Sequence, residues 1–400
     1  MNILQITNKV PYPTKDGGAI ACMNLTSGFA LLGHDVTVLA MNTEKHHVDV
    51  SEIPESVQDW AKFRLVGVPA RISLLAAAVN LVFSEKPYNA VRFFSKKFSD
   101  ELTTLLREKH FDIVQLEGLY VCHYIPLIRK YSKAKIVYRA HNIEHEIWER
   151  TAAISKNPRK LYLKILANRI KKFEKMFINR YDLLVPITER DGQILDRMGN
   201  KKPMHISPTG IDTKVLIPYC KYLEHPSLFH IGSLEWAPNQ EGLLWFIEQC
   251  WPGIHEKFPD LKFYIAGRNA PDWLIRRFNA PNIVFEGEVT DAYKFMNSKS
   301  IMVVPLFSGS GMRIKIIEGM ALGKPIVSTP IGNEGISNAA GKNILIAENR
   351  DEFISAIERL ISDKDLFDRI SRNAIEYIHE KFDNLALAGA LIRFYKEHAG

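Results

Sequence analysis

Residues 305–327 read PLFSGSGMRIKIIEGMALGKPIV and hold the pattern that decides the fold. A β-branched run ends at Pro305, a loop of Gly and Ser follows, and a helix is expected to begin near Met312. Its predicted first turn carries Arg313 and Lys315, and two cations beside free backbone N–H groups suit a diphosphate. Cations there oppose the helix dipole, an unfavourable effect that a bound anion would relieve. A solvated first turn is the alternative interpretation.

Short β-branched runs alternate with helical-period segments on both sides of this stretch, which predicts βαβ units and parallel sheets. The pattern restarts after residues 200–226, a connection with several prolines. We therefore expect an α/β protein with doubly wound domains over 1–203 and 204–380, followed by a final helical segment over 381–400. The expected strands are 3–7, 35–40, 63–66, 113–116, 135–140, 182–187, 228–231, 262–266, 283–286, 301–305, 325–328 and 344–346. Two such sheets facing each other would put the carboxyl ends of their strands around one cleft, where α/β sheets bind ligands.

The composition, 46% hydrophobic and 24% charged over 400 residues, is that of a globular protein with room for two cores. Its net charge of +7 favours anionic partners such as nucleotide phosphates, phospholipid head groups or nucleic acid. Four widely spaced cysteines without a CxxC pair suggest neither a disulfide framework nor a zinc site, and a reducing cytosol fits. The longest apolar stretch, 72–83, is too short to span a bilayer.

Gly17 and Gly18 lie between the first expected strand and a helix from Ala19 to Leu32. Adjacent glycines at a helix start allow close backbone approach to a phosphate, although a plain tight turn explains them equally well. They do not form the GxGxxG fingerprint, so a dehydrogenase loses its main support.

His141 follows the expected strand 135–140, where an imidazole can hydrogen-bond a sugar hydroxyl or a phosphate. His145 stands one helical turn further on and Glu146 follows it, which suggests a metal pair. The HExxH order and a third placed ligand are missing, so no metal is predicted. In the second half, Glu318 lies deeper in the helix after Arg313, where a carboxylate can accept from ribose hydroxyls.

Together these motifs resemble the retaining glycosyltransferases of the GT-B fold, specifically glycosyltransferase family 4, over most of the chain. The fold so implied has two Rossmann-like domains facing across a cleft and a C-terminal helix that crosses back to the first domain. The segments that carry the resemblance are 308–327, the strand before Gly17 and Gly18, the strand ending at His141, and 207–212, 231–233, 265–267 and 285–289.

The resemblance implies a role for each matching residue. Glu318 matches the second glutamate of the paired-glutamate motif, which binds the ribose of the donor. His141 matches a cleft residue near the donor sugar and acceptor, and with Arg313 and Lys315 it forms the expected catalytic set. The remaining donor-binding positions are Gly17, Gly18, Gly232, Arg268, Val289, Ser310, Gly311, Met312 and Ile316.

Two departures from the family pattern concern charge. The first glutamate of the pair is Ser310 here, so the usual carboxylate contact to the donor sugar is missing. The Arg and Lys that follow the first strand of the second domain fall at Ser233 and Asn239, both uncharged. We hypothesise that Arg313 and Lys315 supply the displaced charge.

The predicted function is a retaining transfer of a hexose-type sugar from a nucleotide diphosphate sugar to a glycan or lipid-linked acceptor in cell-surface polysaccharide assembly. No cofactor or metal is expected, because protein cations can stabilise the leaving diphosphate. A non-hydrolysing sugar-nucleotide epimerase and a non-catalytic nucleotide-sugar binding protein are the alternatives. A nucleic-acid partner is not expected, because the basic residues are not interleaved with a recognised binding motif.

Two segments could contact an anionic membrane from the cytoplasm. Residues 156–180 are dense in Lys and Arg, with Glu174 the only acid, and carry Leu, Ile and Phe at helical spacing. Residues 71–98 form a second, more apolar candidate. A scaffold helix with a basic outer face explains residues 156–180 slightly better.

Overall fold

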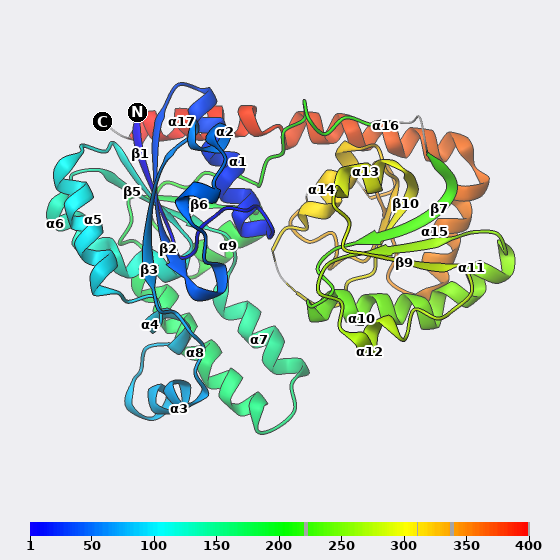
Figure 1. Cartoon of the computed structure of the whole chain (residues 1–400), viewed down its shortest axis with the longest axis horizontal. Coiled ribbons are helices and arrows are strands. Elements are labelled where there is room, and N and C mark those ends of the chain that lie inside the picture. Colours follow the sequence, from blue (N-terminus) through cyan, green and yellow to red (C-terminus); the bar gives the residue numbers. More distant parts are fainter. Residues whose placement is uncertain (220–222, 310, 337–339, 399–400) are drawn as a thin grey trace. The chain divides into compact units, whose positions relative to one another are not determined.

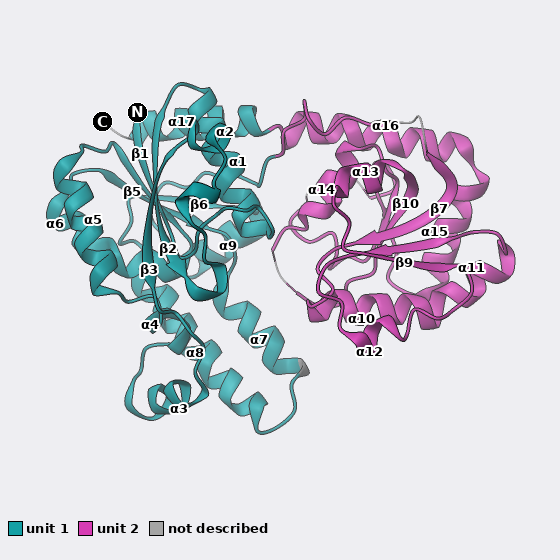
Figure 2. Cartoon of the chain, viewed as in Figure 1, with its two compact units in different colours: residues 1–210, 384–400 teal, residues 211–383 magenta. Residues whose placement is uncertain are grey.

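The computed structural model describes residues 1–219, 223–309, 311–336 and 340–398, which form two compact units (Figure 2). Unit 1 comprises Met1–Gly210 and Asn384–Gly400, and unit 2 comprises Ile211–Asp383. Each unit is a parallel six-stranded sheet with helices packed against it (Figure 1). The α/β class and the two Rossmann-like domains expected from the sequence are confirmed.

The sheet of unit 1 has the order β3-β2-β1-β4-β5-β6, so the strand order reverses between β1 and β4. In register, Ile3 pairs with Val36 on one side and with Ile113 on the other. Each expected strand of this half is present. The strands are β1 (Asn2–Thr7), β2 (Asp35–Thr43), β3 (Lys62–Val68), β4 (Ile113–Glu117), β5 (Lys135–Ala140) and β6 (Leu183–Pro186).

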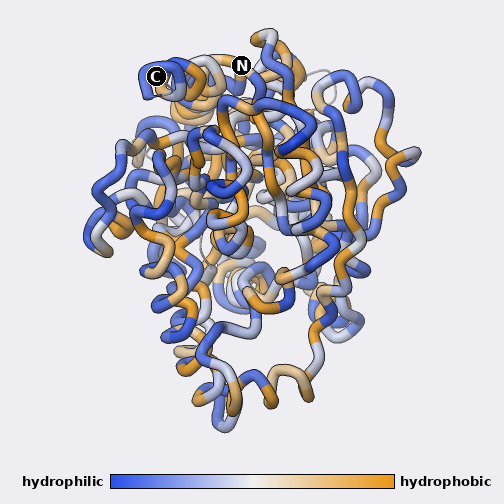
Figure 3. Tube along the Cα trace, turned by 90° about the vertical axis from the view of Figure 1, so that its left-hand side faces the viewer, coloured by the Kyte–Doolittle hydropathy of each residue, from blue (hydrophilic) through white to orange (hydrophobic). Residues whose placement is uncertain are grey.

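Two hydrophobic layers cover the faces of this sheet, because its strands are apolar on both sides. The trace coloured by hydropathy shows hydrophobic segments in the interior and hydrophilic ones around them (Figure 3). The helices are α1 (Gly17–Leu31), η1 (Glu44–His46), η2 (Val50–Glu52), α2 (Glu55–Gln58), α3 (Leu74–Phe83), α4 (Tyr88–Val91), α5 (Lys96–Glu108), η3 (Leu119–Tyr124), α6 (Ile125–Tyr131), α7 (Glu144–Ile154), α8 (Arg159–Phe177), α9 (Glu189–Arg197) and α17 (Asn384–His398).

Unit 2 repeats the strand order of unit 1, as β12-β11-β10-β7-β8-β9, and reverses between β7 and β10. All the strands expected in this half are present. They are β7 (Glu224–Ile231), β8 (Phe263–Ala266), β9 (Ile283–Gly287), β10 (Lys299–Val304), β11 (Ile326–Ser328) and β12 (Leu345–Ile346). The helices are α10 (Ala237–Trp245), η4 (Phe246–Cys250), α11 (Trp251–Lys257), α12 (Asp272–Ile275), α13 (Ala292–Asn297), α14 (Ile314–Ala321), α15 (Arg350–Ser362) and α16 (Lys364–Lys381).

The end of the chain returns to unit 1. The final helical segment expected over 381–400 is α17, which belongs to unit 1, whereas α16 ends at Lys381 and belongs to unit 2. Helix α17 packs closely on α1. Gly28 of α1 lies so near α17 that an added side chain would overlap Ala388. The Asp363 carboxylate accepts from the backbone N–H of Leu366 and caps α16, as the sequence predicts.

Candidate functional site

The carboxyl ends of β7 and β10 meet where the strand order of unit 2 reverses, the position at which open α/β sheets bind ligands. Close backbone packing shapes this edge. A side chain at Gly242 of α10 would overlap the carbonyl oxygen of Pro305, which follows β10, and one at Gly267 would overlap that of Gly232. Glycine is therefore required at Gly242 and Gly267 for the elements around the site to approach one another.

Lys315 lies at this switch point and is held by groups at the end of β7. Its Nζ donates to Asn239 Oδ1 at 2.9 Å and to the carbonyl oxygen of Ile231 at 3.2 Å. It also lies 3.3 Å from Nε2 of His230, whose Nδ1–H donates to the carbonyl oxygen of Val303 at 2.9 Å. Burial, reinforced by the positive charge of Arg313, lowers the pKa of Lys315 to about 7. Burial also lowers the pKa of His230, which is therefore neutral and can accept from Lys315.

The position of Lys315 bears on the charge missing from the family pattern. The family's lysine falls at Asn239 in this sequence, and the ammonium of Lys315 hydrogen-bonds that same side chain. A side chain added at Gly232 would lie 3.1 Å from this ammonium. Gly232, Asn239 and Lys315 thus form one group at the end of β7.

Arg313 takes a different position from the one expected. Helix α14 begins at Ile314, so Arg313 is its N-cap residue and not part of its first turn. The side chain is almost fully buried, donates to the carbonyl oxygen of Gly311 at 2.6 Å and lies over the ring of Trp236 at 5.3 Å. Helix α14 begins only after Arg313 because the backbone of Arg313 is extended, with φ −89° and ψ 90°.

Glu318 of α14 accepts a hydrogen bond from the Tyr293 hydroxyl at 3.1 Å. Burial raises the pKa of Glu318 to about 7, although the Tyr293 hydrogen bond opposes this shift. The carboxyl group of Glu318 therefore titrates near neutral pH. Tyr293 was not predicted from the sequence, since no motif marks it.

The other predicted donor-binding residues are distributed over the same edge of unit 2. Val289 lines a hollow of about 420 Å³ after β9. The carbonyl oxygen of Arg268 accepts from the backbone N–H of Leu234 at 2.9 Å. The side chain of Ile316 is fully buried in the core, so it cannot face a ligand. Met312 is half-buried, and Ser310 lies outside the described residues.

In unit 1, His141 is joined to a buried carboxylate that the sequence analysis missed. Its Nε2 lies 2.6 Å from Oε2 of Glu117, the last residue of β4. Arg139 is also buried, and its Nη1 is 3.5 Å from the same oxygen. Burial alone would raise the pKa of Glu117, but Arg139 and the hydrogen bond to His141 outweigh it and lower the pKa. The signal in the sequence is the charged residue that ends the run IVQLE.

A hydrogen-bond chain connects this carboxylate to the C-terminal helix. The Tyr395 hydroxyl of α17 donates to Gln115 Oε1 at 2.6 Å, and the Gln115 amide donates to Glu117 Oε1. Gln5 donates to the same oxygen at 3.5 Å. Polar groups from β1, β4 and α17 therefore fix the carboxylate that contacts His141.

The helical spacing suggested for His141 and His145 is not present. His141 precedes α7, whereas His145 lies within it, so the two are not one helical turn apart. The Nδ1 of His145 instead bonds Glu174 of α8, and this carboxylate accepts from the backbone N–H groups of Glu144 and His145. Glu174 therefore caps α7. Within the described ranges, no group of three His, Cys, Asp or Glu side chains is arranged to hold a metal ion.

Gly17 opens α1, and the residue before it is an acidic cap. The Asp16 carboxylate accepts from the Ala19 N–H at 3.0 Å and pairs with Lys9 at 2.6 Å. Neither Gly17 nor Gly18 has a positive φ. This geometry is that of a capped strand-to-helix turn, and Asp16 occupies the helix end with its own negative charge.

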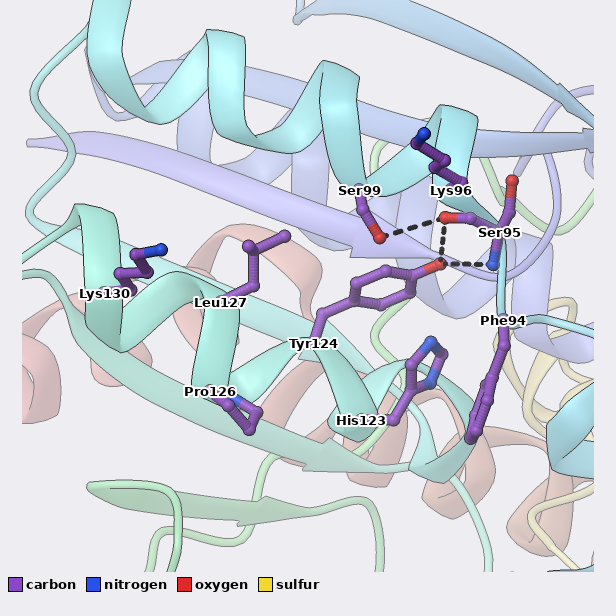
Figure 4. A pocket seen from close by; sticks show the side chains of 9 residues that line it. All are labelled: Phe94, Ser95, Lys96, Ser99, His123, Tyr124, Pro126, Leu127 and Lys130. Carbon is purple, nitrogen blue, oxygen red and sulfur yellow. Dashed lines mark hydrogen bonds between the residues drawn. The ribbon is translucent and has the colours of Figure 1, made fainter.

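A separate pocket of about 570 Å³ in unit 1 lies between α5, η3 and α6 (Figure 4). The ring of His123 stacks between Phe94 and Tyr124, and its Nδ1 bonds the carbonyl oxygen of Tyr120. Burial lowers the pKa of His123 to about 4. None of the predicted site residues lines this pocket.

None of the helices in the described part of the chain combines the length and the apolar character needed to cross a membrane.

Two family models match this chain. The model described as Glycosyltransferase Family 4 matches residues 15–215, and the model described as Glycosyl transferases group 1 matches residues 225–363. A protein of Klebsiella pneumoniae described as an uncharacterized 44.6 kDa protein in cps region is 23% identical over 410 residues, or 98% of this chain and 99% of that protein.

Similar solved structures include sucrose-phosphate synthase from Thermosynechococcus elongatus, with a TM-score of 0.74 and 14% identity over 99% of both chains. Anabaena HepE in complex with UDP-glucose has a TM-score of 0.69 and 12% identity over 99% of both chains. TarM of S. aureus, solved with fondaparinux, alpha-GlcNAc-glycerol and UDP, has a TM-score of 0.70 and 12% identity over 98% of this chain and 99% of that one. At these identities the similarity shows the fold alone.

Proposed function

This chain belongs to glycosyltransferase family 4, and we propose that it is a retaining transferase that moves a hexose-type sugar to a glycan or lipid-linked acceptor in cell-surface polysaccharide assembly. As a glycosyltransferase of this group it uses a nucleotide sugar. The observation that carries the proposal is the ammonium of Lys315 at the switch point of unit 2, beside Asn239, where the family's own lysine is absent.

The donor diphosphate binds to unit 2 at the end of β7 and the start of α14. Lys315 and Arg313 supply positive charge there, and the first backbone N–H groups of α14 add the positive end of the helix dipole. Glu318, four residues after the start of α14, accepts from the ribose hydroxyls, and Tyr293 orients its carboxyl group. Gly232 leaves room for the phosphate groups because it has no side chain beside Lys315.

Transfer breaks the bond between the anomeric carbon and the donor phosphate oxygen and forms a bond from that carbon to the acceptor hydroxyl oxygen. The acceptor proton passes to the leaving phosphate, and attack occurs on the face from which the diphosphate departs. Negative charge grows on the diphosphate as the bond breaks, so Lys315 and Arg313 stabilise the transition state more than the ground state. We propose that these cations make the reaction independent of a metal ion.

His141 is the residue of unit 1 that we assign to the sugar or the acceptor. Its Nε2–H donates to Glu117, so a neutral imidazole offers its lone pair at Nδ1 to a hydroxyl group. Glu117 is a positioning residue, because it fixes the orientation and the tautomer of this ring. Arg139 and the hydrogen bond to His141 lower the pKa of Glu117 and keep its carboxylate charged in spite of its burial.

Two similar proteins support the proposed donor and the proposed pathway. The Klebsiella relative comes from a cps region, which favours a role in polysaccharide assembly, and HepE was solved with UDP-glucose, which favours a hexose donor. A lipid-linked acceptor would bring the enzyme to the cytoplasmic face of a membrane.

A thermal-shift screen against UDP-, GDP- and ADP-sugars tests the proposal. The correct donor at one hundred times its dissociation constant should stabilise the protein by roughly 2.7 kcal/mol. The product formed with an added acceptor should keep the anomeric configuration of the donor in an NMR spectrum. An inverted product, or no stabilisation by any sugar nucleotide, would contradict the proposal.

A further inference from the structure

Helix α3 exposes nearly all of its apolar side chains. Its sequence LLAAAVNLVF has no charged residue, and Ala77 is its one fully buried side chain. The large apolar side chains exposed on α3 or just before it are Ile72, Leu74, Leu75, Val79, Val82 and Phe83. Folded monomers seldom expose a contiguous apolar patch of this extent, and such patches usually mark an interaction site.

Polar anchors hold α3 in place, while its apolar side chains remain exposed. At its carboxyl end, the two Nη groups of Arg169 in α8 donate to the carbonyl oxygens of Asn80 and Leu81 at 3.1 and 2.7 Å. At its amino end, the backbone N–H of Ser73 donates to the Tyr88 hydroxyl at 2.9 Å. The helix is therefore attached by its ends, beside α8 (Figure 1).

The surroundings of α3 are basic. No acidic residue occurs between Lys62 and Ser84, and Glu174 is the only acid in residues 156–180. Glu174 is buried and caps α7, so it does not offset the basic surface of α8. The exposed residues of α8 are mainly basic or apolar: Arg159, Leu161, Lys164, Ile165, Asn168, Lys172, Lys175 and Met176.

We propose that α3 inserts into the interface of an anionic phospholipid membrane and that the exposed basic residues of α8 contact the lipid head groups. Apolar side chains next to a surface of lysines complement a negatively charged bilayer surface, although Glu85 after α3 and Glu149 of α7 are exposed acids nearby. This inference goes beyond sugar transfer, and it identifies α3, rather than α8 alone, as the membrane-binding element.

The distribution of the side chains favours lipid over a protein groove. A groove covers one stripe of a helix, with anchors three and four residues apart. On α3, the stripe of Leu75, Val79, Val82 and Phe83 is exposed, and so are Leu74 and Ala76 outside it. Lipid chains can surround such a helix on several sides, whereas a groove would leave part of this apolar surface in water.

The experiment uses the full chain and sedimentation with vesicles of phosphatidylcholine, with and without phosphatidylglycerol, in the absence of any sugar nucleotide. The wild type should bind the anionic vesicles and bind more weakly at high salt. The double variant Leu75→Asp, Phe83→Asp alters side chains that are 77% and 83% exposed, so the fold should persist. It should lower vesicle binding by at least about tenfold.

A matched control carries the same change of charge elsewhere. Val215 and Ile217 of unit 2 are 67% and 60% exposed, and the variant Val215→Asp, Ile217→Asp should bind vesicles within about twofold of the wild type. A Phe83→Trp variant should lose fluorescence with brominated lipids, because quenching requires contact with the acyl chains.

Equal loss of binding in both double variants, or an unchanged affinity after Leu75→Asp, Phe83→Asp, would overturn the proposal. The proposal is also wrong if the wild type does not bind anionic vesicles but forms dimers, and the variant Leu75→Asp, Phe83→Asp is monomeric. The exposed surface of α3 would then be an interface between copies of the chain. Nucleotide binding is measured separately in solution. Failure of the membrane-binding proposal can therefore be distinguished from failure of the proposed sugar-nucleotide binding.

Discussion

Replacing Lys315 by methionine should weaken donor binding by about 10- to 150-fold. A hydrogen bond from a charged donor contributes about 1.5–3 kcal/mol, and each 1.4 kcal/mol is a tenfold change in affinity. Methionine is similar in length and apolar, so the packing beside Gly232 is preserved while the ammonium is lost. Isothermal titration calorimetry with the nucleoside diphosphate selected in the thermal-shift screen measures the effect.

The pH dependence gives a second, independent signature of Lys315. Its pKa is lowered to about 7, so the fraction of the free enzyme that carries the ammonium falls as the pH rises through neutrality. Only the ammonium attracts the diphosphate. Affinity should therefore fall above pH 7, approaching about tenfold per pH unit, and binding there should take up a proton. Titrations in buffers of different ionisation enthalpy count that proton, which should be absent in Lys315→Met.

A variant in which the ammonium is moved from position 315 to position 239 provides the control. Adding Asn239→Lys to Lys315→Met returns an ammonium to the same place from α10, because the two side chains are 2.9 Å apart. Most of the lost affinity should return. Lys257→Met, which removes an exposed ion pair with Glu358, should change donor affinity less than twofold. The reasoning is wrong if Lys315→Met binds donor within about threefold of the wild type, or if wild-type affinity is constant between about pH 6 and 9.

Three further substitutions test the remaining structural assignments. Glu117→Gln should lower the free energy of unfolding in urea by roughly 3–5 kcal/mol, since buried Arg139 loses its counter-charge, and unchanged stability would contradict that pairing. Glu318→Gln should raise the free energy of unfolding at pH 8 by about 1–3 kcal/mol but not near pH 4, because burial raises the pKa of Glu318 to about 7 and penalises its ionised form. Gly242→Ala should destabilise unit 2 by roughly 2 kcal/mol or more in the same assay, because its methyl group overlaps a carbonyl oxygen after β10.

The fold could be predicted because its signals are local. In β4, Ile113, Val114 and Leu116 are apolar and fully buried, as is typical of a strand covered on both faces. Prolines and glycines mark the connections between such runs. The start of α14 was placed two residues too early, because the extended backbone of Arg313 cannot be read from residue types alone.

Candidate site residues could be proposed only where a motif marks them, and these assignments stay predictions. Glu318 and His141 follow from family motifs, but their partners Tyr293 and Glu117 come from other elements and share no spacing with them. The contact of His145 with Glu174, a residue 29 positions later in the sequence, was missed for a related reason. Contacts between distant segments depend on the packing of whole elements, which a spacing rule does not contain.

The proposed role of Lys315 rests on its place in space and not on its place in the sequence. A position-by-position comparison finds Asn239 where the family has a lysine and predicts a weakened site. Nζ of Lys315, 76 residues away in the sequence, lies 2.9 Å from the Asn239 side chain, because α10 follows β7 and α14 follows β10, and these two strands are neighbours at the switch point. Either helix can therefore deliver an ammonium to the same point. If the double variant with lysine at 239 recovers donor affinity, it is the location of the charge, rather than its position in the sequence, that determines binding of the diphosphate.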